Sequence, residues 1–143
     1  MTQYLFVYGT LDPERAPSEI AHAVARLSPV GEASVPGVLY DFGEYPGAVF
    51  NQASKRKIFG RVFRIPDDPK VLRQLDEYEG FAPSDTDNSL FVRELRPVKL
   101  AGGRTLPCWV YVYNRPPGNA RQVRGGALRR RRSRSVARDR AAS

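Results

Sequence analysis

Residues 105–114 read Thr-Leu-Pro-Cys-Trp-Val-Tyr-Val-Tyr-Asn, and they carry the strongest strand pattern in the chain. After Pro107 this stretch is almost wholly aromatic or β-branched, and such residues favour an extended backbone. We therefore expect residues 105–114 to form a strand of the protein's sheet.

Other strand-like segments lie upstream of it. Residues 3–8 form an aromatic and β-branched run that stops at Gly9, which predicts a buried first strand. Residues 90–100 alternate apolar and polar side chains, as a half-buried strand does. Further strands are predicted over residues 30–40, 48–50 and 57–65, with a bend or bulge at Pro36-Gly37.

Two segments have helical spacing instead. Between residues 17 and 27, Ile20, Val24 and Leu27 recur at helical intervals. A second helix is expected to open at Asp67-Asp68-Pro69 and to end at Gly80. Many strands with two short helices predict an α+β domain with a curled or barrel-like sheet.

The composition excludes several classes of protein and site. The chain has 143 residues, 41% of them hydrophobic, which fits one globular domain. We find neither a membrane-spanning run nor a signal-peptide pattern, so a cytoplasmic location is expected. Cys108 and His22 are the sole cysteine and histidine, which excludes an internal disulfide and a thiol or histidine-rich metal cluster. Acid–base catalysis would therefore fall to a carboxylate or a tyrosine.

The net charge of +8 comes from the C-terminal segment. Nine arginines and one acid, Asp139, follow from Arg121 onward, whereas the residues before it carry 14 basic and 14 acidic side chains. The composition changes after Pro116-Pro117-Gly118, and the arginine-rich part has little to bury. We predict a folded domain over residues 1–117 and an arginine-rich, disordered tail over residues 118–143.

Residues 8–11, Tyr-Gly-Thr-Leu, are the first candidate for function. A strand that leads into a glycine turn can aim successive backbone N–H groups at one point, which suits an anion or an oxyanion. An ordinary turn at the end of a strand explains the same residues.

Residues 75–80, Leu-Asp-Glu-Tyr-Glu-Gly, are the second candidate. Three acids in four residues usually form a solvated helix face, and negative charge is disfavoured near a helix C-terminus. Glu79 precedes the glycine that ends the helix, where the chain could turn it inward. Burial would then raise its pKa toward neutrality, as a proton shuttle requires. A surface acid remains the alternative.

The order of these motifs resembles the γ-glutamylcyclotransferase-like family (the AIG2-like and γ-glutamylamine cyclotransferase group). The resemblance covers residues 3–115. It rests on Tyr8-Gly-Thr-Leu11, Gly37-Val-Leu-Tyr-Asp-Phe-Gly-Glu-Tyr-Pro46, Gly60-Arg-Val-Phe63, Leu75-Asp-Glu-Tyr-Glu-Gly80, Phe91-Val-Arg93 and Trp109-Val-Tyr-Val-Tyr113.

This resemblance implies a small mixed β-barrel with short flanking helices. It also implies that Glu79 is the catalytic acid/base and that Tyr8, Gly9, Thr10 and Leu11 bind the substrate. The implied reaction closes a γ-glutamyl amide into 5-oxoproline and releases an amine, with no metal or cofactor. The expected partner is this small-molecule substrate, and no membrane partner is expected.

Two departures from the family leave alternatives open. Phe91 stands where members commonly have tyrosine, and residues 124–128 lead into polyarginine rather than into the family's usual closing element. One alternative is a binding module of the same fold without turnover. Another is contact with nucleic acid through the tail, although the tail has no aromatic side chains for stacking and an inert, solvated tail is the preferred interpretation.

Overall fold

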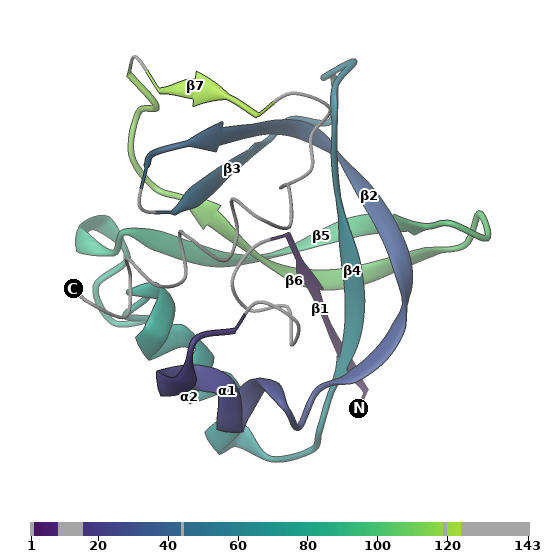
Figure 1. Cartoon of the computed structure of the whole chain (residues 1–143), viewed down its shortest axis with the longest axis vertical. Coiled ribbons are helices and arrows are strands. Elements are labelled where there is room, and N and C mark those ends of the chain that lie inside the picture. Colours follow the sequence, from purple (N-terminus) through teal and green to yellow (C-terminus); the bar gives the residue numbers. More distant parts are fainter. Residues whose placement is uncertain (1, 9–15, 44, 119, 124–143) are drawn as a thin grey trace.

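The computed structural model describes residues 2–8, 16–43, 45–118 and 120–123 (Figure 1). Five strands close into a barrel in the order β2, β4, β1, β6, β5 and back to β2. All these pairings are antiparallel except that of β1 with β6. The elements are β1 Gln3–Val7, α1 Ser18–Val24, β2 Ser28–Asp41, β3 Pro46–Phe50, β4 Lys57–Ile65, α2 Pro69–Glu79, the 3₁₀ turn η1 Thr86–Asn88, β5 Phe91–Leu100, β6 Thr105–Tyr113 and β7 Arg121–Gln122. The predicted α+β barrel with short flanking helices is confirmed.

Strand β2 changes its antiparallel partner along its length. Residues 28–36 pair with β4, and residues 37–41 pair with β3. The bend or bulge predicted at Pro36-Gly37 is not a break: the strand continues there, and the register shift lies between Pro29 and Gly31. Gly37 is instead the residue at which the partner changes, and a Cβ on it would lie 2.6 Å from the carbonyl oxygen of Val49.

The sheet continues beyond residue 117, where the domain boundary was predicted. Arg121 and Gln122 of β7 pair with Asp41 and Tyr40 of β2. The N–H of Val123 then donates to the carbonyl oxygen of Leu39 at 2.7 Å. The arginine-rich segment 124–143, predicted to be disordered, lies outside the described residues.

Strand β1 is buried on both faces because it lies between two apolar layers. Alternate residues of β1 show this clearly: Phe6 faces the barrel interior, whereas Leu5 and Val7 face the layer beneath the helices. This explains why β1 is a continuous hydrophobic run rather than an alternating one. The helices lie over one end of the barrel's outer surface and leave the other end uncovered (Figure 1).

Helix α2 has the start and the end that its sequence predicts. The carboxylate of Asp68 accepts a hydrogen bond from the backbone N–H of Lys70 at 3.0 Å, and Pro69 opens the first turn. Gly80 ends the helix in the left-handed region, with φ 75° and ψ 32°. Among the described residues, none of the helices has the length and apolar character needed to cross a bilayer.

Candidate active site

Glu79 is the last residue of α2, and its surroundings hold the end of the helix in place. The N–H of Phe81 donates to the carbonyl oxygen of Asp76 at 2.9 Å, which closes the final turn. The N–H of Leu90 donates to the carbonyl oxygen of Gly80 at 3.2 Å. The helix end is therefore fixed directly to the start of β5.

The three acids of this motif do not form a solvated face. Asp76 and Glu79 are buried, at 6% and 8% exposed, whereas Glu77 is exposed. Residues three apart lie on the same side of an α-helix, so both buried carboxylates face the barrel. The solvated face that clustered acids usually indicate is therefore wrong for Asp76. Its three-residue spacing from Glu79 was the signal in the sequence that could have revealed its burial.

Asp76 is held by side chains from two adjacent strands. It accepts hydrogen bonds from Nε and Nη2 of Arg93 at 2.8 and 3.1 Å and from the hydroxyl of Tyr111 at 2.6 Å. Arg93 of β5 and Tyr111 of β6 are direct cross-strand partners, which brings both donors to the same carboxylate. The guanidinium of Arg93 also lies 4.2 Å from the centre of the Trp109 ring. We call Asp76, Arg93 and Tyr111 the Asp76 network.

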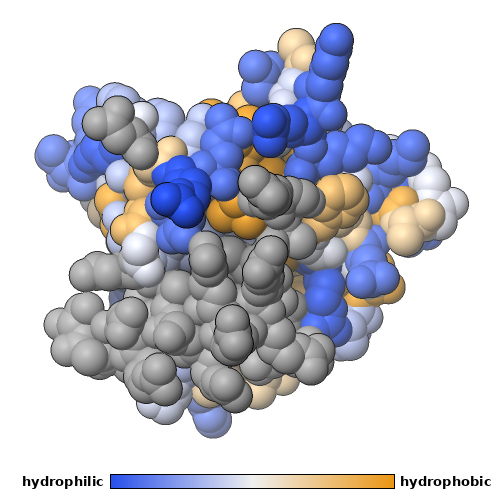
Figure 2. All heavy atoms as spheres, turned by 45° about the horizontal axis from the view of Figure 1, so that its top comes forward, coloured by the Kyte–Doolittle hydropathy of each residue, from blue (hydrophilic) through white to orange (hydrophobic). Residues whose placement is uncertain are grey.

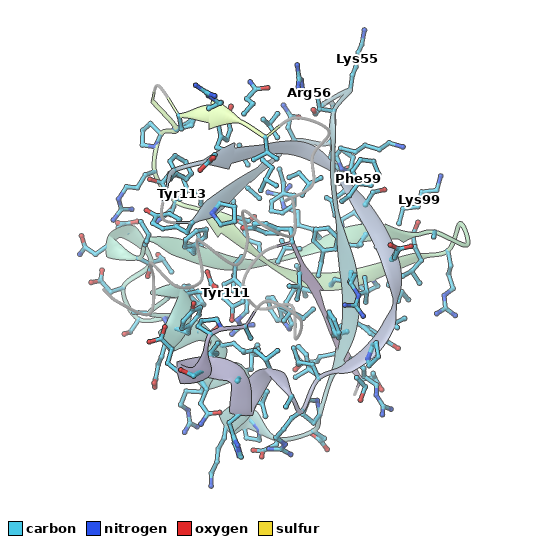
Figure 3. The ribbon with its side chains drawn as sticks, viewed as in Figure 1. Lys55, Arg56, Phe59, Lys99, Tyr111 and Tyr113 are labelled. Carbon is cyan, nitrogen blue, oxygen red and sulfur yellow. The ribbon has the colours of Figure 1, made fainter. Side chains whose placement is uncertain are left out.

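The hydroxyl of Tyr111 is kept protonated at this position. Burial raises the pKa of Tyr111 well above its ordinary value, and the negative charges of Asp76 and Glu79 raise it further. The Tyr111 hydroxyl is therefore a neutral hydrogen-bond donor at physiological pH. It lies close enough to Glu79 for the negative charge of that carboxylate to raise its pKa. Figure 3 shows Tyr111 near the helices, with Tyr113 further toward the other end of the barrel.

Tyr8 is the predicted substrate-binding residue that the structure describes. It follows β1 and is buried at 8% exposed, and its hydroxyl donates to the backbone carbonyl of Tyr111. Tyr111 thus contacts Tyr8 through its main chain and Asp76 through its side chain. The other predicted binding residues, Gly9, Thr10 and Leu11, lie outside the described residues.

Aromatic side chains line the ends of β5 and β6 near this site. Phe42 stacks on Tyr113 with ring centres 4.2 Å apart. Phe91, at 1% exposed, meets the rings of Tyr45 and Tyr113 edge-on at 5.8 and 5.6 Å. Residues 37–46, one of the motifs that carry the family resemblance, thus supply Phe42 and Tyr45 to an aromatic wall around Phe91.

A cavity of about 660 Å³ borders the Asp76 network. Asp76, Arg93, Leu72 and Phe81 are among its lining residues, whereas Glu79 and Tyr8 are not. Within the part of the chain that the structure describes, no three His, Cys, Asp or Glu side chains gather as metal ligands would. The arrangement offers proton transfer by a carboxylate, with Arg93 neutralising the second carboxylate beside it.

Comparison with known proteins links this chain to a family. The family model "Gamma-glutamyl cyclotransferase, AIG2-like" matches residues 5–130. No match was found among curated protein sequences.

Solved structures share the fold. The AIG2-like protein of Mus musculus has a TM-score of 0.66 at 15% identity, with 90% of this chain and 88% of that chain covered. For ytfP of Escherichia coli the TM-score is 0.62 at 27% identity, with 90% and 98% covered. YkqA of Bacillus subtilis has a TM-score of 0.64 at 22% identity; the match covers 90% of this chain but only 40% of YkqA.

Proposed function

Because this chain belongs to the gamma-glutamyl cyclotransferase, AIG2-like family, we propose that it converts a γ-glutamyl amide into 5-oxoproline and a free amine. The observation that carries the proposal is the burial of Glu79 at the end of α2. A surface acid would be solvated, whereas this carboxylate lies beside a structured polar network.

The reaction needs few catalytic groups because its nucleophile is part of the substrate. The α-amine attacks the γ-carbonyl carbon and forms a C–N bond that closes a five-membered ring. The bond to the leaving nitrogen then breaks, which gives 5-oxoproline and an amine. Well-oriented intramolecular attack can be worth effective concentrations on the order of 10⁵–10⁸ M. The protein must therefore fold the substrate and move one proton.

Glu79 is the residue that we assign to this proton. Its carboxylate takes a proton from the attacking α-amine and passes it to the leaving nitrogen, so it ends the cycle unprotonated. General acid–base catalysis by a placed side chain typically contributes about 10²- to 10⁴-fold in rate. A single carboxylate can perform both steps because they are successive.

The Asp76 network positions Glu79, in our proposal, rather than reacting itself. Arg93 neutralises Asp76, so the charge of this carboxylate does not add to that of Glu79 at the buried helix end. Tyr111 joins the helix to the end of β1, where Tyr8 leads into the predicted substrate loop. We assign the backbone N–H groups of residues 9–11 to the substrate's oxyanion or α-carboxylate.

The test is 5-oxoproline release from a panel of γ-glutamyl amides, comparing the native chain with Glu79→Gln. We expect release by the native chain and a fall of about 10²- to 10⁴-fold in kcat for the variant. Glu77→Gln is the matched control, because Glu77 is exposed on the same helix two residues earlier. It should retain the native rate.

Four outcomes separate the interpretations. Loss in Glu79→Gln alone supports the proposal. If Glu77→Gln loses as much activity, the rate depends on the total negative charge of the helix and not on Glu79 itself. If 5-oxoproline release survives Glu79→Gln, Glu79 is not the proton shuttle. No release from any substrate would favour the binding module, for which Phe91, buried between Tyr45 and Tyr113, is the main departure from the family's usual tyrosine.

A further inference from the structure

The uncovered end of the barrel exposes an aromatic ring among basic side chains. Ser34 of β2 pairs with Lys99 of β5 on one side and with Phe59 of β4 on the other. Cross-strand partners project from the same face of a sheet, so Lys99 and Phe59 flank the small side chain of Ser34. Phe59 is 48% exposed, which is unusual for phenylalanine in a barrel wall.

A hollow of about 280 Å³ adjoins this ring. Val38, Leu39, Val123 and Phe59 give it apolar walls, and the β3–β4 turn and the start of β4 add basic residues to it. These basic residues are Lys55, Arg56 and Lys57. Figure 2, which brings this end forward, shows hydrophobic surface between strongly hydrophilic groups, and Figure 3 shows Lys55, Arg56, Phe59 and Lys99 projecting there. We call Lys55, Arg56, Lys57, Phe59 and Lys99 the basic surface.

The basic surface holds four cations, Lys55, Arg56, Lys57 and Lys99. All four are exposed, and none of them forms an ion pair within the described residues. The nearest acid by register, Glu32 of β2, stands opposite Arg61 of β4. Asp41 likewise stands opposite Arg121 of β7. The surface therefore keeps a net positive charge.

The arginine-rich segment follows this surface in the sequence. Val123 lines the hollow, and the chain continues from it into residues 124–143, which carry eight arginines and one acid. The arginines of that segment can neutralise phosphates, but the segment has no aromatic side chain on which a base could stack. The folded barrel supplies the aromatic ring next to the point where the segment starts.

We propose that the basic surface binds single-stranded nucleic acid. The base of one nucleotide stacks on Phe59 at the hollow, and the flanking phosphates meet Lys55, Arg56, Lys57 and Lys99. Exposed rings bind unpaired bases because the faces of bases in a duplex are already stacked. Cations at the rim follow the backbone without regard to sequence.

The experiment is a titration of the full-length chain into fluorescein-labelled oligo(dT) and oligo(U), followed by anisotropy over a series of salt concentrations. Phe59→Ala should weaken binding about 5- to 150-fold, since one stacked base is typically worth about 1–3 kcal/mol. The variant K55Q/R56Q/K57Q should flatten the slope of log K against log[salt] by about 2, since each lost phosphate contact removes about 0.7.

Two controls keep the test specific to this surface. Phe59→Leu keeps an apolar side chain without a ring and should weaken binding nearly as much as Phe59→Ala. The variant R64Q/K70Q/R73Q removes three exposed cations at the helix-covered end and should bind like the native chain. Thermal unfolding of each variant establishes that it is folded.

Several results would overturn the proposal. One is the absence of binding at low salt. Another is binding that neither Phe59→Ala nor K55Q/R56Q/K57Q changes, because the oligonucleotide would then be bound by the tail alone. Equal binding to a duplex or to heparin would indicate a general polyanion site. Binding to anionic phospholipid vesicles in preference to both oligonucleotides would indicate a membrane surface.

Discussion

The two ends of strand β4 carry the same kind of side chain on the same outward face but bury it very differently. Phe63 is 1% exposed within the apolar layer that also contains residues of α1 and α2. Phe59, four residues earlier, is 48% exposed at the end that the helices leave uncovered (Figure 1). Helix cover, not the strand pattern, decides which outward phenylalanine is part of the core.

Strand β5 shows the same contrast for charge. Arg93, beneath the helices, is paired with Asp76, and its side chain is 14% exposed. Lys99, six residues later on the same face, is exposed and forms no ion pair within the described residues. A buried cation must be paired because an unpaired one would lose its hydration without compensation. An exposed one is available for a partner.

The largest expected effect is the difference in the free energy of unfolding between variants at the two phenylalanines of β4. Phe63→Ala should lower the free energy of unfolding by about 3–5 kcal/mol, because it removes a ring and leaves a cavity. Phe59→Ala should change it by no more than about 0.5 kcal/mol. Urea unfolding of both variants measures the difference. Comparable losses would show that Phe59 belongs to the core after all.

The next effect comes from the two cations of β5. Arg93→Gln should cost about 3 kcal/mol, because it leaves the buried carboxylate of Asp76 without its charge partner. Lys99→Gln should stay within about 0.5 kcal/mol of the native chain. The same urea experiment compares them, and a cost at Lys99 similar to that at Arg93 would mean that the basic surface also stabilises the fold.

Most of the fold could be predicted from the sequence because local patterns specify it. The strand over residues 57–65 and the helix that ends at Gly80 were placed where the structure has them. Strand β7 was missed, since Arg121-Gln122 is too short and too polar to show a period. The partner change of β2 at Gly37 was missed as well, because pairing depends on residues distant in sequence.

The candidate site was only partly predictable. The burial of Glu79 agrees with the interpretation that turned it inward, and its catalytic role stays a prediction. The Asp76 network could not be foreseen, because it depends on the register that sets Arg93 opposite Tyr111. Alternation along each strand gives the face of a side chain but not its neighbour across the sheet.

The smallest of these effects isolates the hydroxyl of Tyr111. Tyr111→Phe removes one hydrogen bond to Asp76 but leaves both bonds from Arg93, so the free energy of unfolding should fall by about 1.5 kcal/mol at neutral pH. The raised pKa of Tyr111 adds a dependence on pH. Its neutral form is favoured by folding, so its contribution is complete below the ordinary tyrosine pKa of 10.0 and is lost as the pH rises above it.

The native chain should therefore lose stability more steeply than Tyr111→Phe above about pH 10, and the two unfolding curves should converge. Burial raises the pKa of Cys108 to about 12, but that thiol is present in both proteins and cancels in the difference. Urea unfolding of both proteins between neutral and alkaline pH makes the comparison. A difference that stays constant with pH would mean that the hydroxyl ionises as easily in the folded protein as in the unfolded chain, and Tyr111 would then lose its assignment as a protonated donor to Asp76.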